Sequence, residues 1–255
     1  MSPVGAAATR AGLLPVLLAV LGTLPSMACS AEPALGEAAA PVPTGALVTD
    51  CTVTLSPGTD IQPHIQADAV ICLAAGRYPG ALRIEVPVTL QADQGAVLDA
   101  EGKGPVIHVA QNGIEVRLRG LTLSGGASEF GAGLLVDTYA EVAVDRCTLR
   151  GNEGGQGGAA GLGAMRGRLL VRQLKADPDQ DIVLGGRAEA AIEASTLPGA
   201  LSVRDGAKVG IRGGQVGPID LRGTTSRKPE LVLEGVDTGA VDNHPTVPGT
   251  LRQTP

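Results

Sequence analysis

The chain has 255 residues, of which 44% are hydrophobic, and its formal net charge is -6 at pH 7. This composition fits neither a disordered chain nor a small disulfide scaffold, and the negative charge argues against a nucleic-acid partner. With one Phe, two Tyr, no Trp and 37 Gly, the core must consist of aliphatic side chains joined by frequent turns, which is typical of stacked short strands rather than a helical bundle.

Residues 1–28 have the pattern of a secretory signal. They contain one charged side chain, Arg10, then an apolar run from Gly12 to Leu24 and a boundary of small residues that ends at Ala28. The run is short and is interrupted by proline, so we do not expect it to span a membrane, and no later segment is apolar enough to do so. We therefore expect an exported protein.

Cys29 directly follows Ala28, at the position where bacterial lipoproteins carry their acyl chains. The boundary resembles a lipobox, but Ser26 stands where such proteins usually have Leu, so cleavage without acylation is the alternative. Residues 29–47 are rich in Ala, Pro and Gly and predict a flexible tether in either case. The expected location is the outer membrane or cell surface through a lipid anchor, and otherwise the periplasm or the medium.

An apolar triplet recurs along the rest of the chain, and in each triplet a variable residue lies between two apolar ones. The triplets begin at Val88, Val116, Val142, Leu169, Ala190, Val209 and Leu231. Successive starts lie 19 to 28 residues apart, which matches one coil of a solenoid. Because side chains alternate along a strand, the first and third residues of every triplet are expected to share one buried face.

The residue that follows each triplet, from the second coil onward, alternates in charge: Arg119, Asp145, Arg172, Glu193, Arg212 and Glu234. If coils stack at about 4.8 Å, each of these charges lies between opposite charges on the solvent face. Each exposed pair contributes at most about 1 kcal/mol, but a slip by one coil would set like charges against each other. We interpret this charge ladder as control of register rather than as catalytic machinery.

The remaining cysteines have two expected roles. Cys51 and Cys72 lie in the first apolar segments of an exported chain, so we predict a disulfide between them, with a stabilisation of roughly 3 kcal/mol. Cys147 lies three residues after its triplet, in a column shared with Leu121 and Leu174. We therefore predict that Cys147 is a buried structural residue rather than a reactive thiol.

Four segments, at residues 69–78, 86–90, 118–126 and 147–152, carry a resemblance to a known superfamily. They resemble the right-handed parallel β-helix proteins of the pectin-lyase-like superfamily, and the resemblance covers about residues 50 to 238. It implies an all-β fold, a single-stranded right-handed parallel β-helix of about seven to eight coils. We place this domain at residues 48–238 and expect residues 239–255 to form a polar tail.

Many members of this superfamily cleave acidic polysaccharides, so a lyase or a glycoside hydrolase is the alternative function. A lyase needs carboxylates that hold calcium and an Arg or Lys base; the loose candidates are Asp99, Asp137 and Asp145 with Arg117 and Arg146. The hydrolase signatures Asn-Thr-Asp, Asp-Asp and Gly-His-Gly are absent, and Asp177-Pro178-Asp179 lacks the histidine of an epimerase motif, so it predicts a turn. We assign no catalytic residue, no metal site and no cofactor.

The first three coil intervals are longer than the last three, so extra residues must leave the helix as loops at residues 124–133 and 152–161. Next to these loops we predict a ligand-binding surface made by Glu129, Phe130, Asp137 and Tyr139. The alternative interpretation is that the loops are insertions without a function. The sequence thus favours a monomeric structural, adhesive or binding module of the cell envelope, with a polysaccharide or another cell-surface molecule as its partner.

Overall fold

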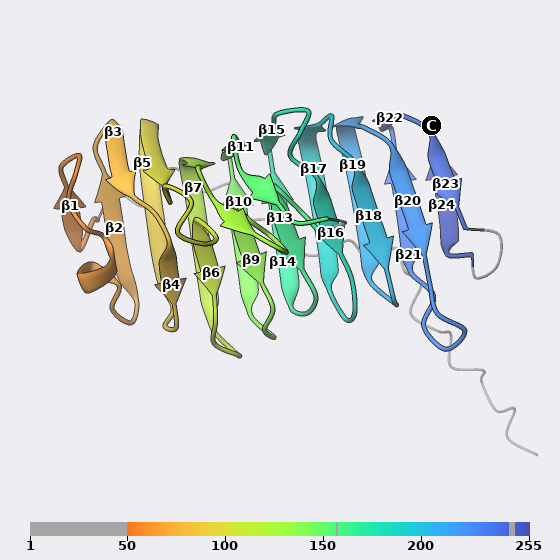
Figure 1. The fold of residues 1–255 in the computed structure, drawn as a ribbon, viewed down its shortest axis with the longest axis horizontal. Coiled ribbons are helices and arrows are strands. Elements are labelled where there is room, and N and C mark those ends of the chain that lie inside the picture. Colours follow the sequence, from red (N-terminus) through yellow and green to blue (C-terminus); the bar gives the residue numbers. More distant parts are fainter. Residues whose placement is uncertain (1–49, 157, 245–247) are drawn as a thin grey trace, which may run out of the picture. The chain divides into compact units, whose positions relative to one another are not determined.

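The computed structural model describes residues 50–156, 158–244 and 248–255. The predicted leader at 1–28, Cys29 and the tether at 29–47 lie outside these residues. The described residues form an all-β parallel solenoid of about nine turns (Figure 1), and their only helix is the 3₁₀ turn η1 (Gln62–His64). The predicted fold class is confirmed, with slightly more coils than the seven to eight expected.

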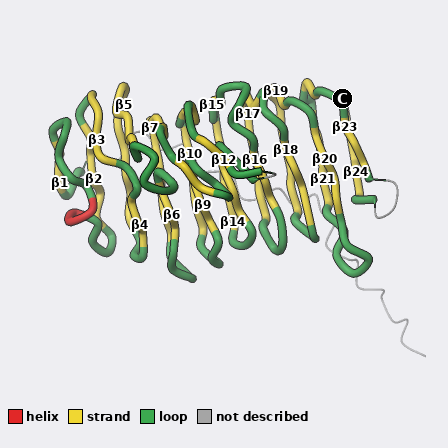
Figure 2. The backbone as a smooth tube through the Cα atoms, in the orientation of Figure 1, coloured by secondary structure: helices red, strands yellow, loops and turns green. Residues whose placement is uncertain are grey.

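One sheet follows the whole length of the solenoid, with each strand next to the strand of the following coil (Figure 2). In spatial order its strands are β1 (Val53–Leu55), β2 (Ala69–Leu73), β5 (Val88–Asp99), β7 (Glu115–Ser124), β10 (Glu141–Asp145), β14 (Arg168–Arg172), β17 (Glu189–Leu197), β19 (Lys208–Val216), β21 (Glu230–Glu234) and β24 (Thr250–Thr254). The short strands β3 (Gly76–Pro79), β11 (Thr148–Arg150), β15 (Lys175–Ala176) and β22 (Asp237–Thr238) pair with the second halves of its longer strands or with each other. We call this the first sheet.

A second sheet contains the strands that precede the triplets. Its strands are β4 (Leu82–Ile84), β6 (Ile107–Val109), β9 (Leu134–Val136), β13 (Leu162–Ala164), β16 (Ile182–Leu184), β18 (Leu201–Arg204), β20 (Ile219–Arg222) and β23 (Val241–Asn243). The predicted loops at 124–133 and 152–161 stack on each other, because β8 (Ala127–Ser128) pairs with β12 (Glu153–Gly154).

The core is built from the predicted apolar triplets. Leu118 pairs in register with Leu90 on one side and with Val144 on the other, and Val144 pairs with Val171. None of these four side chains is more than 2% exposed. Burying each side chain of this size contributes about 1.5 to 3 kcal/mol, so the stacked aliphatic columns are the main source of stability.

A stack of residues with positive φ bends the first sheet directly after the charge ladder. The φ angle is 66° at Gly120, 52° at Arg146, 48° at Gln173 and 48° at Ala194. At Gly120 a Cβ atom would lie 2.1 Å from the carbonyl oxygen of Ala92, so only glycine fits there. The bend lets the two halves of a strand such as β7 pair with the preceding coil on either side of the corner.

The charge ladder lies in the register that the sequence predicts. The strand pairing sets its six charged residues next to one another in alternating sign. Three ion pairs form along it, Arg119–Asp145 at 3.3 Å, Arg172–Glu193 at 3.7 Å and Arg212–Glu234 at 2.6 Å. The prediction of a stacked charge ladder is therefore confirmed.

A buried polar pair connects the loops of three successive coils. Asn152, which follows β11, is 4% exposed, and Gln180, which follows β15, is 1% exposed. The Asn152 Nδ2 atom donates to the Leu123 carbonyl oxygen at 3.1 Å and to Gln180 Oε1 at 2.7 Å, while Asn152 Oδ1 accepts from the Gly126 amide at 3.0 Å. Each buried polar atom of Asn152 thus has a partner in the coil before it or after it.

The C-terminal residues differ from the predicted polar tail. Val241 of β23 pairs with Ile219, and Leu251 of β24 pairs with Leu231, so the solenoid continues past residue 238. In β24 the one apolar residue is Leu251, which is partly buried. The strand is held by backbone pairing rather than by an apolar pattern, which is why the sequence does not reveal it.

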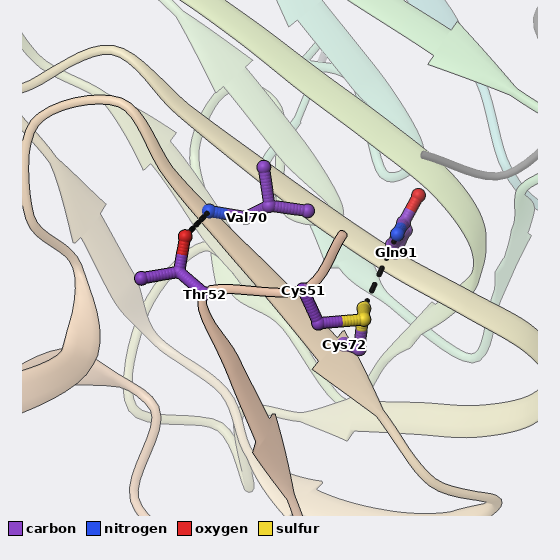
Figure 3. Close-up of a disulfide and its surroundings, with 5 residues drawn as sticks. All are labelled: Cys51, Thr52, Val70, Cys72 and Gln91. Atoms are coloured by element: carbon purple, nitrogen blue, oxygen red, sulfur yellow. Dashed lines mark hydrogen bonds between the residues drawn. A yellow bond between two sulfur atoms is a disulfide. The ribbon is translucent and has the colours of Figure 1, made fainter. Parts of the chain in front are cut away.

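The predicted disulfide closes the first coil (Figure 3). Cys51 precedes β1 and is bonded to Cys72 of β2, with 5.8 Å between their Cα atoms. The Thr52 hydroxyl accepts from the Val70 amide at 3.0 Å, and Gln91 Nε2 donates to Cys72 Sγ at 3.2 Å. The bond therefore ties the terminal strand β1 to the strand on which it stacks.

Cys147 is the free cysteine of the described residues, and it is buried at 1% exposure, as predicted. Its Sγ donates to the Asp145 carbonyl oxygen at 3.5 Å. Burial raises the pKa of the Cys147 thiol from 9.0 to about 12, because the thiolate would be formed away from water. The thiol therefore stays protonated and unreactive in the folded chain at neutral pH.

This raised pKa predicts an alkaline loss of stability. The folded chain holds the Cys147 proton more tightly than the unfolded chain, so the contribution of this group is complete below about pH 9 and decreases as the pH rises toward 12. The loss should approach about 1.4 kcal/mol per pH unit in this range. Urea denaturation of the wild type and of Cys147→Ala from pH 8 to pH 11 should show that the free energy of unfolding falls more steeply with pH in the wild type. Parallel curves for the two proteins would contradict this prediction.

Candidate functional site

A shallow groove of about 590 Å³ lies at the corner where each coil passes from the second sheet into the first. Its wall is formed by the residues that precede β7, β10, β14 and β17 and by the first residue of each of these strands. The side chains that give it chemical character are Glu115, Tyr139, Glu141, Arg168, Arg187 and Glu189. The groove therefore crosses several coils and combines an aromatic ring with charges of both signs.

Backbone hydrogen bonds between successive coils hold the wall of this groove. The Gly113 amide donates to the Tyr139 carbonyl oxygen at 2.8 Å, and the Glu189 amide donates to the Gly167 carbonyl oxygen at 2.9 Å. Gly167 has a φ of 82°, and a Cβ atom there would lie 2.5 Å from the carbonyl oxygen of Ala140. The groove is thus built on a tightly packed backbone, which suits a preformed site.

Among the large hydrophobic residues that the structure describes, Tyr139 is the most exposed, at 48%. The guanidinium carbon of Arg166 lies 5.8 Å from the centre of the Tyr139 ring. Arg187 Nη1 donates a hydrogen bond to the Tyr139 hydroxyl oxygen at 3.4 Å. The Tyr139 amide donates to Asn112 Oδ1 at 2.9 Å. Two arginines and a fixed backbone therefore orient an aromatic ring toward solvent.

The charged side chains of the groove are available to a ligand. Arg168 lies in register between Glu141 and Glu189, but within the described part of the chain none of the three forms an ion pair within 4.0 Å. Glu115 differs, because it is paired with Arg117. The groove can therefore offer two carboxylates and two guanidinium groups, those of Arg168 and Arg187, beside the exposed ring.

The structure separates the four predicted binding residues. Tyr139 lines the groove, and Asp137 lies two residues before it, with its Oδ1 atom 3.1 Å from Nε2 of His108. Glu129 and Phe130 lie in the loop that follows β8 and are not among the groove residues. A Cβ atom at Gly163 would lie 2.6 Å from the Phe130 ring, so this ring covers the centre of β13 instead.

The loose catalytic candidates are not brought together as one site. Of the five, Asp145 and Arg146 alone pair with each other, and Asp145 also pairs with Arg119 of the charge ladder. The others have partners outside the set: Asp99 pairs with Arg77, Asp137 with His108, and Arg117 with Glu115. In the described ranges no three His, Cys, Asp or Glu residues are placed to hold a metal ion. Residues 178–179 form a turn, closed by the Gln180 amide donating to the Asp177 carbonyl oxygen at 3.0 Å.

The prediction from sequence missed Glu141, Arg168, Arg187 and Glu189. Three of them occupy the position directly before the apolar triplet, which carries a charge in six successive coils: Glu115, Glu141, Arg168, Glu189, Lys208 and Glu230. The alignment of the triplets contains this column, and its sign alternates from Glu141 onward. Arg187 lies three residues before its triplet, at the same position as Tyr139 and Arg166, but this column also contains glycine in two coils, so its residue types do not mark it as a site.

The part of the chain that the structure describes contains no helix with the length and hydropathy of a membrane span. Comparison with models of known protein families, with curated proteins and with solved structures finds no match to this chain.

Proposed function

We propose that this chain is an exported, lipid-anchored β-helix protein of the cell envelope that acts as a structural or adhesive binding module. We also propose that it is a non-catalytic member of the pectin-lyase-like superfamily. The signal pattern at 1–28, Cys29 and the tether at 29–47 support export and anchoring. The repeat and the parallel solenoid support the superfamily assignment.

The observation that carries a binding function is the exposed ring of Tyr139 among unpaired charges in a rigid groove. Tyr and Arg are enriched among the residues that contribute most to binding interfaces. A flat ring edged by guanidinium and carboxylate groups suits a sugar polymer or another cell-surface molecule with polar and charged substituents.

Binding can be tested with Tyr139→Ala against isolated envelope material and a panel of cell-surface polysaccharides. We expect the variant to bind at least about tenfold more weakly than the wild type, because it removes the exposed aromatic ring of the groove. Phe130→Ala is the matched control, since it removes an aromatic ring that lies outside the groove. Equal affinities of the wild type and Tyr139→Ala would overturn the proposed site.

Anchoring has a separate test in Cys29→Ser. This substitution removes the thiol that would carry the lipid at the leader boundary, so the protein should move from the membrane fraction to the soluble fraction. The fold should be unchanged, because the substituted residue precedes the solenoid. Far-UV circular dichroism provides the control for folding, and unchanged partitioning of the variant would remove the lipid anchor from the proposal.

One observation favours the alternative enzymatic function. Glu115 and Glu141 pair in register on adjacent strands and both line the groove, and glycoside hydrolases use two carboxyl groups around the scissile bond. The purified protein should therefore be incubated with polygalacturonate, alginate and glycosaminoglycans, with and without calcium. New reducing or unsaturated ends that disappear in Glu141→Gln would establish an enzyme and overturn the non-catalytic assignment.

A further inference from the structure

The outer face of the first sheet carries charges that are constant in sign along each strand and opposite on the next strand. From β10 to β21 the two outer residues of each strand are Glu141 and Asp145, Arg168 and Arg172, Glu189 and Glu193, Lys208 and Arg212, and Glu230 and Glu234. We call the outward residues of these strands the striped face. Only one of its two charged margins is the predicted charge ladder.

Small or apolar residues fill the centre of the striped face. The residues between the charged margins are Ala143, Leu170, Ala191, Gly210 and Val232, one on each strand; Leu170 is 7% exposed, and the other four are partly exposed. The striped face therefore has an apolar centre and charged margins, which is the arrangement of a protein interface with a hydrophobic core and a polar rim.

The two margins of the striped face differ in how far their charges are satisfied. On the ladder side Arg172–Glu193 and Arg212–Glu234 are ion pairs. On the other side Glu141, Arg168, Glu189 and Lys208 form no ion pair with other described residues, although they alternate in the same register. Four successive charges of alternating sign are therefore free to meet a complementary surface, although Glu141, Arg168 and Glu189 also line the groove and cannot contact a ligand and a partner chain at the same time.

We propose that the striped face binds the striped face of a second copy of this chain, with a two-fold axis that runs parallel to the strands and passes between β14 and β17. In this arrangement β14 faces β17 of the partner subunit, and β10 faces its β19. Every facing pair of strands then has opposite charges at both margins. An axis placed on a strand instead of between two strands would set like charges against each other across the whole face.

The sizes of the central residues select this axis over the other one that satisfies the charges. With the axis between β14 and β17, Leu170 lies opposite the partner's Ala191, and Ala143 lies opposite the partner's Gly210. With the axis between β17 and β19, Leu170 would meet Val232 while Ala191 met Gly210, which would combine a clash with a gap. Alternating large and small residues across facing positions is what lets two surfaces pack closely.

The area of the striped face sets the strength of this association. Four strands of five residues cover about 320 Å² per copy, which is well below the roughly 800 Å² that each partner buries in a stable complex. The chain is therefore monomeric in dilute solution and pairs at high local concentration. The contact ends beyond these four strands, because β7 would set Glu115 against the partner's Glu230.

The test is sedimentation velocity of the protein carrying Cys29→Ser, so that no acyl chain contributes to association. In low salt the sedimentation coefficient should rise with protein concentration up to the millimolar range, and the rise should disappear in about 0.5 M NaCl because exposed charges are screened. Arg168→Glu with Arg172→Glu should abolish the rise, and so should Glu189→Arg with Glu193→Arg. An equimolar mixture of the two variants should restore it, since every facing pair of strands is then opposite in charge again.

Arg83→Glu with Arg222→Glu is the matched control, because it changes the net charge as much as the first variant at two exposed positions on the second sheet. This control should associate like the wild type. Restoration by mixing also shows that both charge variants are folded. The proposal is overturned if the wild type does not associate, if either variant still pairs with itself, or if the mixture stays monomeric.

Discussion

Replacing Asn152 by alanine should lower the free energy of unfolding by about 3 to 5 kcal/mol. The substitution removes the hydrogen bonds to Leu123, Gly126 and Gln180, in a site where Asn152 and Gln180 are at most 4% exposed. The cost is large because the backbone and amide groups left behind remain buried and lose their partners. The contacts join three successive coils, so the middle of the solenoid should be the region affected.

Urea denaturation followed by far-UV circular dichroism measures this effect. Asn112→Ala is the matched control, since Asn112 is exposed and its side chain accepts one hydrogen bond, from the Tyr139 amide. We expect the control to cost less than about 1 kcal/mol. A loss of 1 kcal/mol or less in Asn152→Ala would mean that water replaces the missing partners and that this polar pair is not a structural link.

Replacing both Cys51 and Cys72 by serine should destabilise the first coil by about 3 kcal/mol. The bonded residues are 21 positions apart, and the loop between them contains β1, η1 and the start of β2. In a solenoid each coil contacts its neighbours alone, so the free energy is lost locally rather than along the whole chain. The affected strand is β1, which is paired on one side through Val53, Thr54 and Leu55.

Native-state hydrogen exchange distinguishes this local effect from a global one. Amide protons of β1 should exchange about a hundredfold faster in Cys51→Ser with Cys72→Ser than in the wild type. Those of β17 and β19 serve as the internal control and should keep their rates. Equal acceleration in all of these strands would show that the solenoid unfolds as one cooperative unit.

The part of the fold that the sequence predicts is the part that repeats. Val116, Val142 and Leu169 begin triplets that are visible as a pattern, because each coil must supply an inward-facing aliphatic residue at the same position in its strand. The charge ladder follows from the same alignment, because its residues directly follow the triplets. The Cys51–Cys72 bond is predicted separately, from two cysteines in the first apolar segments of a chain with an export signal. Periodicity therefore reveals the stacked strands, their register and their core.

The candidate site depends on positions that repeat but carry different residue types from coil to coil. Tyr139, Arg166 and Arg187 each lie three residues before a triplet, where other coils have residues such as glycine or lysine, so the repeat does not show that these three side chains meet. The Asn152–Gln180 pair joins residues 28 positions apart in segments rich in polar residues, where no pattern marks them. Binding grooves and polar links of this kind become visible only when the coils are superimposed in space.

The scarcity of aromatic residues decides what an optical experiment on this protein can observe. Tyr78 is 1% exposed, with its hydroxyl 2.8 Å from the Leu55 carbonyl oxygen in the first coil, whereas Tyr139 stands 48% exposed in the groove. With no Trp in the chain, ultraviolet emission comes from these two places and leaves the later coils silent. In Tyr139→Phe, Tyr78 would be the one remaining tyrosine, and its fluorescence would report on the disulfide-bonded end. In the wild type, a change in emission on adding a glycan would report occupancy of the groove without any label.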